Sequence, residues 1–398
     1  MKPRTASALA LLGFVVCLFA TPVAAQSVFS ARGLGYLLEP VDARARGLGG
    51  VSIGLPEPEI SWVNPAAAAG LTEPGMIIGY QYDNFTSDAS GSTADGRTAR
   101  FPLLLAAFPA GRFVLMAGYG SYLDQNWRFE VPDSLFLGED TVRIVDLASS
   151  EGGVARMRAG ASYQVNEDLG FGFGIDAYTG QAVRVEGRIF GNAVSPTCCS
   201  SSWEYSGLGY TGGVRYVASE ALSLGASLSY GGTLNAEAIA ADTTEAATVR
   251  ARLASRSYEL PLVVRGGASG RIGQTTSLAL GGSWGAWSTL DEALGGHGGA
   301  RDSWSVEGGL EYDAVTLAGR PLPVRVGGRT AALPFRWGTE ASDPWARERA
   351  LTLGGGILLA GGATRTDLSL EFGDRGSDGA ALDESFWRVG LSVRVLGR

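Results

Sequence analysis

The chain has 398 residues, a formal charge of −8 at pH 7, and 59 glycines against 16 prolines. Apart from Lys2, its basic residues are all scattered arginines, so no basic patch indicates a nucleic-acid partner. Only Cys198 and Cys199 remain once Cys17 is assigned to an export signal. Adjacent cysteines form either a strained ring or a free pair, which excludes a disulfide framework.

The first residues are typical of an export signal. Lys2 and Arg4 precede an apolar stretch over residues 8–20, and small residues follow up to Ala25. We expect residues 1–25 to be a secretory signal peptide that is cut before Gln26. Loss of its two basic residues changes the formal charge from −8 to −10.

Residues 26–74 have few periodic runs and many glycines, prolines and alanines. Pro65 fixes its own φ and lacks an N–H, and it pushes Asn64 toward an extended conformation. Ile60 and Trp62 beside this rigid corner favour burial over the alternative, a disordered periplasmic tail. We therefore expect residues 26–74 to form a compact hatch inside a barrel made by residues 75–398, because a large barrel encloses more space than its own side chains fill.

From residue 75 onward, apolar residues alternate with small or polar ones. In residues 222–232, for example, Leu222, Leu224 and Leu228 share one face while Ser223 and Ser227 share the other. About fourteen such segments follow one another, an even number, and most are long enough to cross a bilayer at a tilt. The predicted segments are 75–85, 98–109, 112–129, 153–165, 169–190, 203–217, 222–237, 256–271, 275–290, 303–314, 320–331, 348–361, 364–374 and 384–397.

Connections between these segments alternate between short and long. Tight turns such as 109–112 and 166–168 alternate with long connections such as 86–97 and 130–152. Outer-membrane barrels have short periplasmic turns and longer outer loops, so both chain ends are expected in the periplasm. The sequence predicts an all-β transmembrane antiparallel barrel of about fourteen strands with an N-terminal hatch.

Aromatic residues of the apolar face support this prediction. Tyr230, Trp284 and Trp304 are expected at the outer rim, and Tyr216 and Tyr312 at the periplasmic rim, as in the aromatic girdles of membrane proteins. The alternative is a soluble β-sandwich, which explains the alternation but neither the strand lengths nor the girdles.

Charged residues occupy the positions that alternate with the apolar ones and are therefore expected to face the lumen. They are tolerated only in a wet or protein-filled lumen. We favour a network of interior ion pairs, with a selectivity filter as the alternative. The expected lumen-facing charges are Arg156, Arg158, Arg215, Arg265, Glu307, Glu311, Arg325, Asp367, Glu371, Arg388 and Arg394.

The segment RGLGGVSIGLPEPEISWVNPAAAAGL, residues 46–71, resembles the N-terminal region of the long-chain fatty acid transporter (FadL/TodX) family and its relatives, which include the PorV-type proteins of type IX secretion. The shared features are a Gly-Gly pair, a polar spacer and an Asn-Pro-Ala motif before the first strand. The resemblance implies a plugged fourteen-stranded barrel that admits hydrophobic molecules and opens by hatch rearrangement. The implied hatch or gate residues are Gly49, Gly50, Asn64, Pro65 and Ala66.

Several features depart from that pattern. The chain ends in VRVLGR without a terminal aromatic residue, the first outer loop has only about a dozen residues, and the interior faces are rich in Gly, Ser and Arg. Residues 64–66 have an alternative role as a simple turn into the barrel. Pro261 removes one ladder donor, which predicts a local kink or bulge.

No set of residues supports catalysis. His297, the single histidine, lies within GGHGG in a long connection, where a base is not held in place. One histidine and two neighbouring cysteines do not form a zinc site. We expect no enzyme activity, no cofactor and no metal.

Two functions remain open, both in the outer membrane of a Gram-negative bacterium. The first is a passive channel for fatty-acid-like hydrophobic small molecules. The second is a PorV-like carrier or docking component of a protein secretion system. An apolar lumen beside the hatch favours the first, and an apolar patch on the outer loops favours the second. The expected partners are outer-membrane lipids, a hydrophobic ligand and the outer-membrane assembly machinery, with secretion proteins under the second hypothesis.

Overall fold

A computed structural model describes residues 27–89, 92–137, 140–190, 193–195, 200–240, 252–296, 299–317, 319–336, 345–376 and 382–397. The expected signal peptide, the pair Cys198 and Cys199, and His297 lie outside the described residues.

Fourteen antiparallel crossings close into a barrel, because the last strand pairs with the first from Leu396 opposite Gly75 to Leu382 opposite Ala89. The crossings are β2 (Gly75–Ala89), β3 (Ser92–Ala110), β4 (Phe113–Asp124) continued by β5 (Trp127–Leu137), β6 (Asp140–Gln164), β7 (Leu169–Phe190), β9 (Ser200–Ser219), β10 (Leu222–Ala240), β11 (Arg252–Ile272), β12 (Thr276–Gly285), β13 (Ser303–Tyr312), β16 (Val324–Ala332), β17 (Arg347–Leu359), β18 (Thr364–Gly376) and β19 (Leu382–Leu396). The predicted fourteen-stranded barrel is confirmed.

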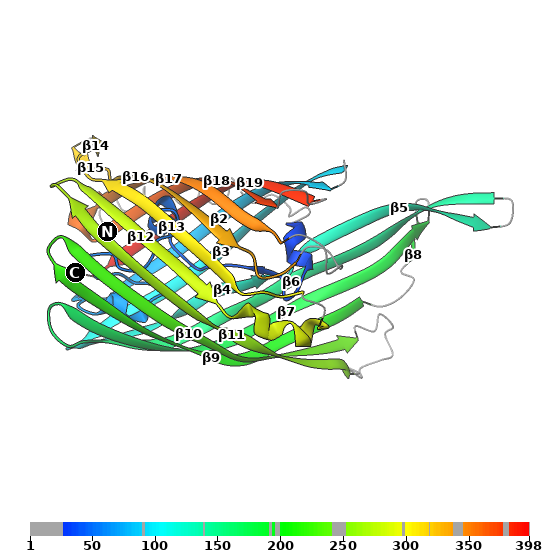
Figure 1. Cartoon of the computed structure of the whole chain (residues 1–398), viewed down its shortest axis with the longest axis horizontal. Coiled ribbons are helices and arrows are strands. Elements are labelled where there is room, and N and C mark those ends of the chain that lie inside the picture. Colours follow the sequence, from blue (N-terminus) through cyan, green and yellow to red (C-terminus); the bar gives the residue numbers. More distant parts are fainter. Residues whose placement is uncertain are drawn as a thin grey trace, which may run out of the picture.

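Short elements precede and connect these strands (Figure 1). The N-terminal segment, defined as residues 27–74, contains η1 (Val28–Ala31), β1 (Tyr36–Leu37), α2 (Ala43–Gly47) and η2 (Pro65–Ala68). The connections contain β8 (Ala193–Ser195), η3 (Trp287–Leu290), η4 (Glu292–Leu294), β14 (Thr316–Leu317), β15 (Arg320–Pro321) and η5 (Ala360–Gly362). No helix in the described part of the chain is long and apolar enough to span a membrane.

The outer face of the barrel is apolar. Leu351 is 73% exposed, and Leu222, Leu228 and Trp284 are also exposed, at outward-facing positions of their strands. Their neighbours of opposite parity, such as Ser227, are buried. A soluble sandwich would bury the apolar side, so this distribution requires lipid outside and excludes the sandwich alternative.

Two connections predicted as loops are largely strand. Residues 86–97 continue β2 and β3 almost to the tip of their hairpin, and residues 130–152 belong mostly to β5 and β6. Figure 1 shows the β5–β6 hairpin projecting beyond the rest of the barrel. These projecting strands carry polar residues on both faces, so the apolar alternation does not mark them. The segment predicted at 275–290 ends as a strand at Gly285, before η3.

Candidate functional site

The N-terminal segment lies inside the barrel and meets the wall at glycines. These inward glycines belong to β17, β16, β13, β11, β10, β9 and β7, so residues 47–69 wind around the lumen. We call this set the glycine belt. A β-carbon on Gly354, Gly327, Gly309, Gly267, Gly225, Gly213, Gly172 or Gly170 would meet Gly47, Gly49, Leu48, Ile53, Gly54, Asn64, Ala66 or Ala69, respectively.

The predicted Gly-Gly pair lies close to the wall. Gly49 and Gly50 have φ values of +78° and +108°, which L side chains rarely adopt. Gly49 packs backbone to backbone on β13 and β16, and a β-carbon on Gly50 would lie 3.4 Å from the Glu307 carboxyl. Both positions therefore favour glycine for conformation, and Gly49 requires it for space as well.

The Asn-Pro-Ala motif forms the start of η2 and is docked on the wall. The Asn64 side-chain oxygen accepts a hydrogen bond from the Ala66 N–H (3.0 Å), and its side-chain nitrogen donates to the Val214 carbonyl of β9 (3.0 Å). Pro65 occupies the first helical position, where its missing N–H has no cost. Ala66 is fully buried against Gly172 of β7. The motif is a rigid turn fixed to β7 and β9.

On the opposite wall the N-terminal segment is held by apolar packing. Ile60, Trp62 and Leu71 pack against a buried cluster on β2, β3 and β4. Arg158 of β6 lies over the Trp62 ring at 4.6 Å and forms an ion pair with Asp176 at 2.6 Å. The part of the lumen around Trp62 is thus filled by protein.

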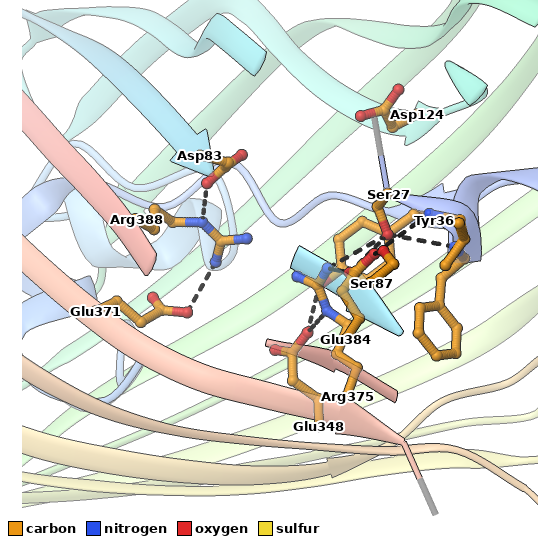
Figure 2. Close-up of polar contacts among 12 residues, drawn as sticks. Ser27, Tyr36, Asp83, Ser87, Asp124, Glu348, Glu371, Arg375, Glu384 and Arg388 are labelled. Atoms are coloured by element: carbon orange, nitrogen blue, oxygen red, sulfur yellow. Dashed lines mark hydrogen bonds and ion pairs between the residues drawn. The ribbon is translucent and has the colours of Figure 1, made fainter. Parts of the chain in front are cut away.

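The start of the N-terminal segment is held by a buried arginine. Arg375 of β18 is fully buried and forms ion pairs with Glu348 and, at 2.6 Å, with Glu384 (Figure 2). Its guanidinium lies between the rings of Tyr36 (4.2 Å) and Phe386 (4.3 Å). Burial raises the pKa of Tyr36 to about 12, so the phenol keeps its proton and donates to Glu348 at 2.6 Å.

A second ionic cluster surrounds α2. Arg44 forms ion pairs with Glu59 and, at 2.7 Å, with Glu311 of β13. Burial opposes ionisation of Glu59, but Arg44 and then Arg365 outweigh it and lower the pKa of this carboxyl. The sequence prediction did not include Arg44, Arg365 or Arg375, because nothing local distinguishes a buried arginine from a solvated one.

The structure places the predicted lumen-facing charges on inward positions, buried or half-buried. Arg325 pairs with Glu311 and Asp367, and Arg388 pairs with Glu371 and with Asp83 of β2 (Figure 2). The other predicted positions have varied surroundings. Arg158 forms an ion pair with Asp176, and Arg265 forms one with Glu39. Arg215 donates a hydrogen bond to the Pro56 carbonyl, and Glu307 accepts one from Ser305. Arg156 lies over the Tyr122 ring, and Arg394 lines a small cavity together with Glu59.

The wall ladder is interrupted between β3 and β4. Their pairing runs only from Ala110 opposite Phe113 to Leu103 opposite Gly120. Beyond that point β1 pairs with the free edge of β4, with Leu37 opposite Leu123. Arg100 of β3 reaches across the interruption to Asp124 of β4, at 2.8 Å. The N-terminal segment therefore closes a gap in the wall.

The predicted irregularity at Pro261 is also present. Tyr230 faces Leu262 and Gly232 faces Leu260, but Tyr230 and Leu262 are exposed while Leu260 is buried. Both strands thus change the facing of their side chains across this site, and Gly232 takes a positive φ of 64°.

Part of the outer lumen is apolar, and a cavity lies beside this part. Tyr122, Tyr178, Leu234 and Tyr258 belong to a buried cluster contributed by β4, β7, β10 and β11. A cavity of about 160 Å³ lies between residues 29–50 and the upper ends of β12, β13 and β16. Apolar groups line it together with charged side chains, which include those of Glu39, Arg46, Glu307, Arg329, Glu348 and Arg388. The cavity wall facing β4 includes Tyr36, Leu37 and Leu38, which are the residues that close the gap.

A family model described as BamG matches residues 4–281. The chain belongs to the BamG family. The match covers the N-terminal segment and the barrel wall as far as β12. No curated protein matches the sequence.

Solved structures share the BamG-family fold. The CymD monoaromatic hydrocarbon channel is 16% identical with a TM-score of 0.55, over 92% of this chain and 99% of that chain. The Pseudomonas putida toluene transporter TodX is 15% identical with a TM-score of 0.54, over 91% of this chain and 98% of that chain. A Pseudomonas aeruginosa FadL homologue is 12% identical with a TM-score of 0.59, over 91% of this chain and 99% of that chain. The predicted resemblance to FadL-type barrels is confirmed for the fold, while the relation to PorV-type proteins stays a prediction. This BamG-family protein is an outer-membrane β-barrel.

Proposed function

We propose that this protein is an outer-membrane channel that admits hydrophobic small molecules past an N-terminal hatch, residues 27–74. The observation that carries the proposal is the position of β1. On one side β1 lines the cavity of about 160 Å³, and on the other it pairs with the free edge of β4. Because β1 lies between the cavity and the gap, its displacement would join the cavity to the lipid phase.

The glycine belt supports assigning movement to β1 rather than to the Asn-Pro-Ala motif. Residues 47–69 are locked against wall backbone, so their displacement would break many close contacts at once. β1 is held by two cross-strand rungs, the hydrogen bond from the Leu38 N–H to the Tyr122 carbonyl (2.8 Å), and the Tyr36 contacts. Local opening follows the segment with the fewest attachments.

The substrate class rests on the fold relatives and the apolar lumen. Two relatives are described as a monoaromatic hydrocarbon channel and a toluene transporter. Buried aromatic rings, including those of Tyr122 and Tyr178, which are tilted by 42° with centroids 5.2 Å apart, suit a flat apolar molecule. We therefore take toluene as the test compound.

The experiment is uptake of labelled toluene by liposomes that carry the purified protein. Leu37→Cys with Leu123→Cys, in a Cys198→Ser and Cys199→Ser background, places two thiols on one rung of the β1–β4 ladder. Directly opposed antiparallel residues suit disulfide geometry. We expect the wild type to take up toluene faster than empty liposomes do, the oxidised variant to match empty liposomes, and reduction to restore the faster uptake. Equal uptake in both redox states would contradict a β1 gate, and uptake equal to that of empty liposomes would contradict a channel.

A second candidate is a docking component of the outer-membrane assembly machinery, which the family name BamG favours, or of a secretion system. One structural observation supports it: the projecting β5–β6 hairpin carries Phe136 at 75% and Val131 at 58% exposure. A photo-crosslinking residue at Phe136, compared with one at the lipid-facing Leu208, tests it in cells. A crosslink to an assembly or secretion subunit from position 136 alone supports docking, and its absence argues against it.

A further inference from the structure

The lipid-facing wall carries a groove of about 960 Å³ across β12, β13, β16, β17 and β18. Its floor is formed by Gly308 and Gly328, which face each other across the β13–β16 ladder. Leu280 borders the groove on the β12 side, and Leu351 and Phe372 border it on the other. These three side chains are 54%, 73% and 54% exposed, respectively.

The floor glycines are not explained by the N-terminal segment. Gly309 and Gly327, one residue away, face the lumen and belong to the glycine belt. Gly308 and Gly328 face outward, where an added β-carbon would meet the ends of Leu280 and Leu351 and the carbonyl oxygens of Ala279 and Ala350. Glycine weakens a strand, and in a strand it often marks the close approach of another molecule.

Positive charge lies at the outer end of this groove. Arg349 lies two residues along β17 from Leu351, between Thr330 and Asp374, and is exposed. Arg347 is exposed one outward position further, opposite Ala332 and Gly376. Neither arginine forms an ion pair with any residue that the structure describes.

Further arginines gather at the same rim. The Trp345 ring lies 4.5 Å from the Arg301 guanidinium and 4.6 Å from that of Arg336. Burial, and then the nearby charges of Arg347 and Arg336, lowers the pKa of Arg301. Arginines therefore gather above a lipid-facing groove whose lining also includes the exposed carboxylate of Asp374.

We propose that this groove binds a phosphorylated lipid of the outer leaflet. One acyl chain lies over Gly308 and Gly328, and the phosphate is bound by Arg347 and Arg349. The occupant follows from location, because the groove opens to the hydrocarbon layer and its arginines lie close to the level of the Trp284–Trp304 pair, where headgroups begin. Arginines there extend to the interface and form charge-assisted hydrogen bonds with phosphate.

Native mass spectrometry of the detergent-purified protein tests the site, with diphosphoryl lipid A as the probe and diacylglycerol as the phosphate-free comparison. Gly308→Leu with Gly328→Leu fills the groove, and Arg347→Gln with Arg349→Gln removes the charge. Gly212→Leu is the matched control, because Gly212 faces outward on β9 and no atom lies within 4 Å of its β-carbon.

We expect the wild type and Gly212→Leu to retain one lipid A under conditions where the groove variant and the arginine variant retain about tenfold less, as loss of paired phosphate contacts predicts. Equal retention by the wild type and the arginine variant overturns the proposal, as does equal binding of diacylglycerol. Heat-dependent migration in gels confirms folding. If the leucine variant does not fold, the arginine variant decides the question alone.

Discussion

Gly49 of the N-terminal segment lies directly on the backbone of Gly328 in β16, so closely that a β-carbon on Gly49 would stand 2.5 Å from the Gly328 carbonyl oxygen. The two residues are 279 positions apart in the sequence. Inside the barrel, therefore, two stretches of backbone pack without side chains between them.

Gly49→Ala is expected to destabilise the folded barrel by about 1–3 kcal/mol, because the substitution combines a positive φ with backbone overlap. The measurement is the urea midpoint for loss of the heat-modifiable band. Gly212→Ala is the control, since its β-carbon meets nothing within 4 Å. Equal midpoints for the two variants would show that the N-terminal segment does not pack on the wall as described.

Arg375→Gln is expected to cost about 3–5 kcal/mol, because the substitution leaves Glu348 and Glu384 buried without their common partner. Arg128→Gln removes an ion pair with Glu130 whose two side chains are about half exposed, so it is expected to cost less than about 1 kcal/mol. Urea unfolding compares the two. A small effect at Arg375 would mean that water reaches these carboxylates.

The alternation of residues was sufficient to predict the barrel wall. Every crossing needs an apolar face toward lipid, so runs such as Leu222 to Tyr230 mark the strands wherever the membrane lies. The pattern fails at residues 130–152 because the β5–β6 hairpin projects beyond the rest of the barrel (Figure 1), where no apolar face toward lipid is needed. There Glu130, Pro132 and Asp133 interrupt the apolar face.

The interior was predictable only in outline. Parity indicates that Arg325 and Glu311 face inward, but it does not indicate that Arg44 comes from the N-terminal segment to pair with Glu311. Likewise, Gly-Gly pairs such as Gly308-Gly309 are visible in the sequence. Gly308 lies in the outer groove and Gly309 packs on the backbone of the N-terminal segment. Both roles depend on residues far away in the chain, so the pair alone does not predict them.

Acid is expected to loosen the attachment of α2. Arg44 lowers the pKa of Glu59 despite burial, so the stability from this ion pair is fully present above the usual glutamate range. This stability is lost as pH falls through the lowered pKa of Glu59, which lies below the usual glutamate value of about 4.3. Asp42 acts oppositely, because burial and then Glu59 raise its pKa and its protonation favours the folded state.

Hydrogen exchange of peptides from residues 36–69, corrected for intrinsic rates, measures this effect between pH 7 and pH 3.5. Faster exchange in the acid range is expected for the wild type. Glu59→Gln should already exchange faster at pH 7 and change less on acidification. If the variant and the wild type show the same pH dependence, Glu59 is not the titrating group.

Leu38→Trp is expected to reduce toluene uptake to about a third or less, because the larger side chain fills much of the cavity beside β1. The backbone hydrogen bond from residue 38 to the Tyr122 carbonyl does not depend on the side chain, so β1 keeps its pairing. Leu208→Trp places the same ring on the lipid face and is expected to leave uptake unchanged. Initial rates in liposomes with equal amounts of inserted protein give the comparison, and an unimpaired Leu38→Trp rate would mean that the route avoids this cavity.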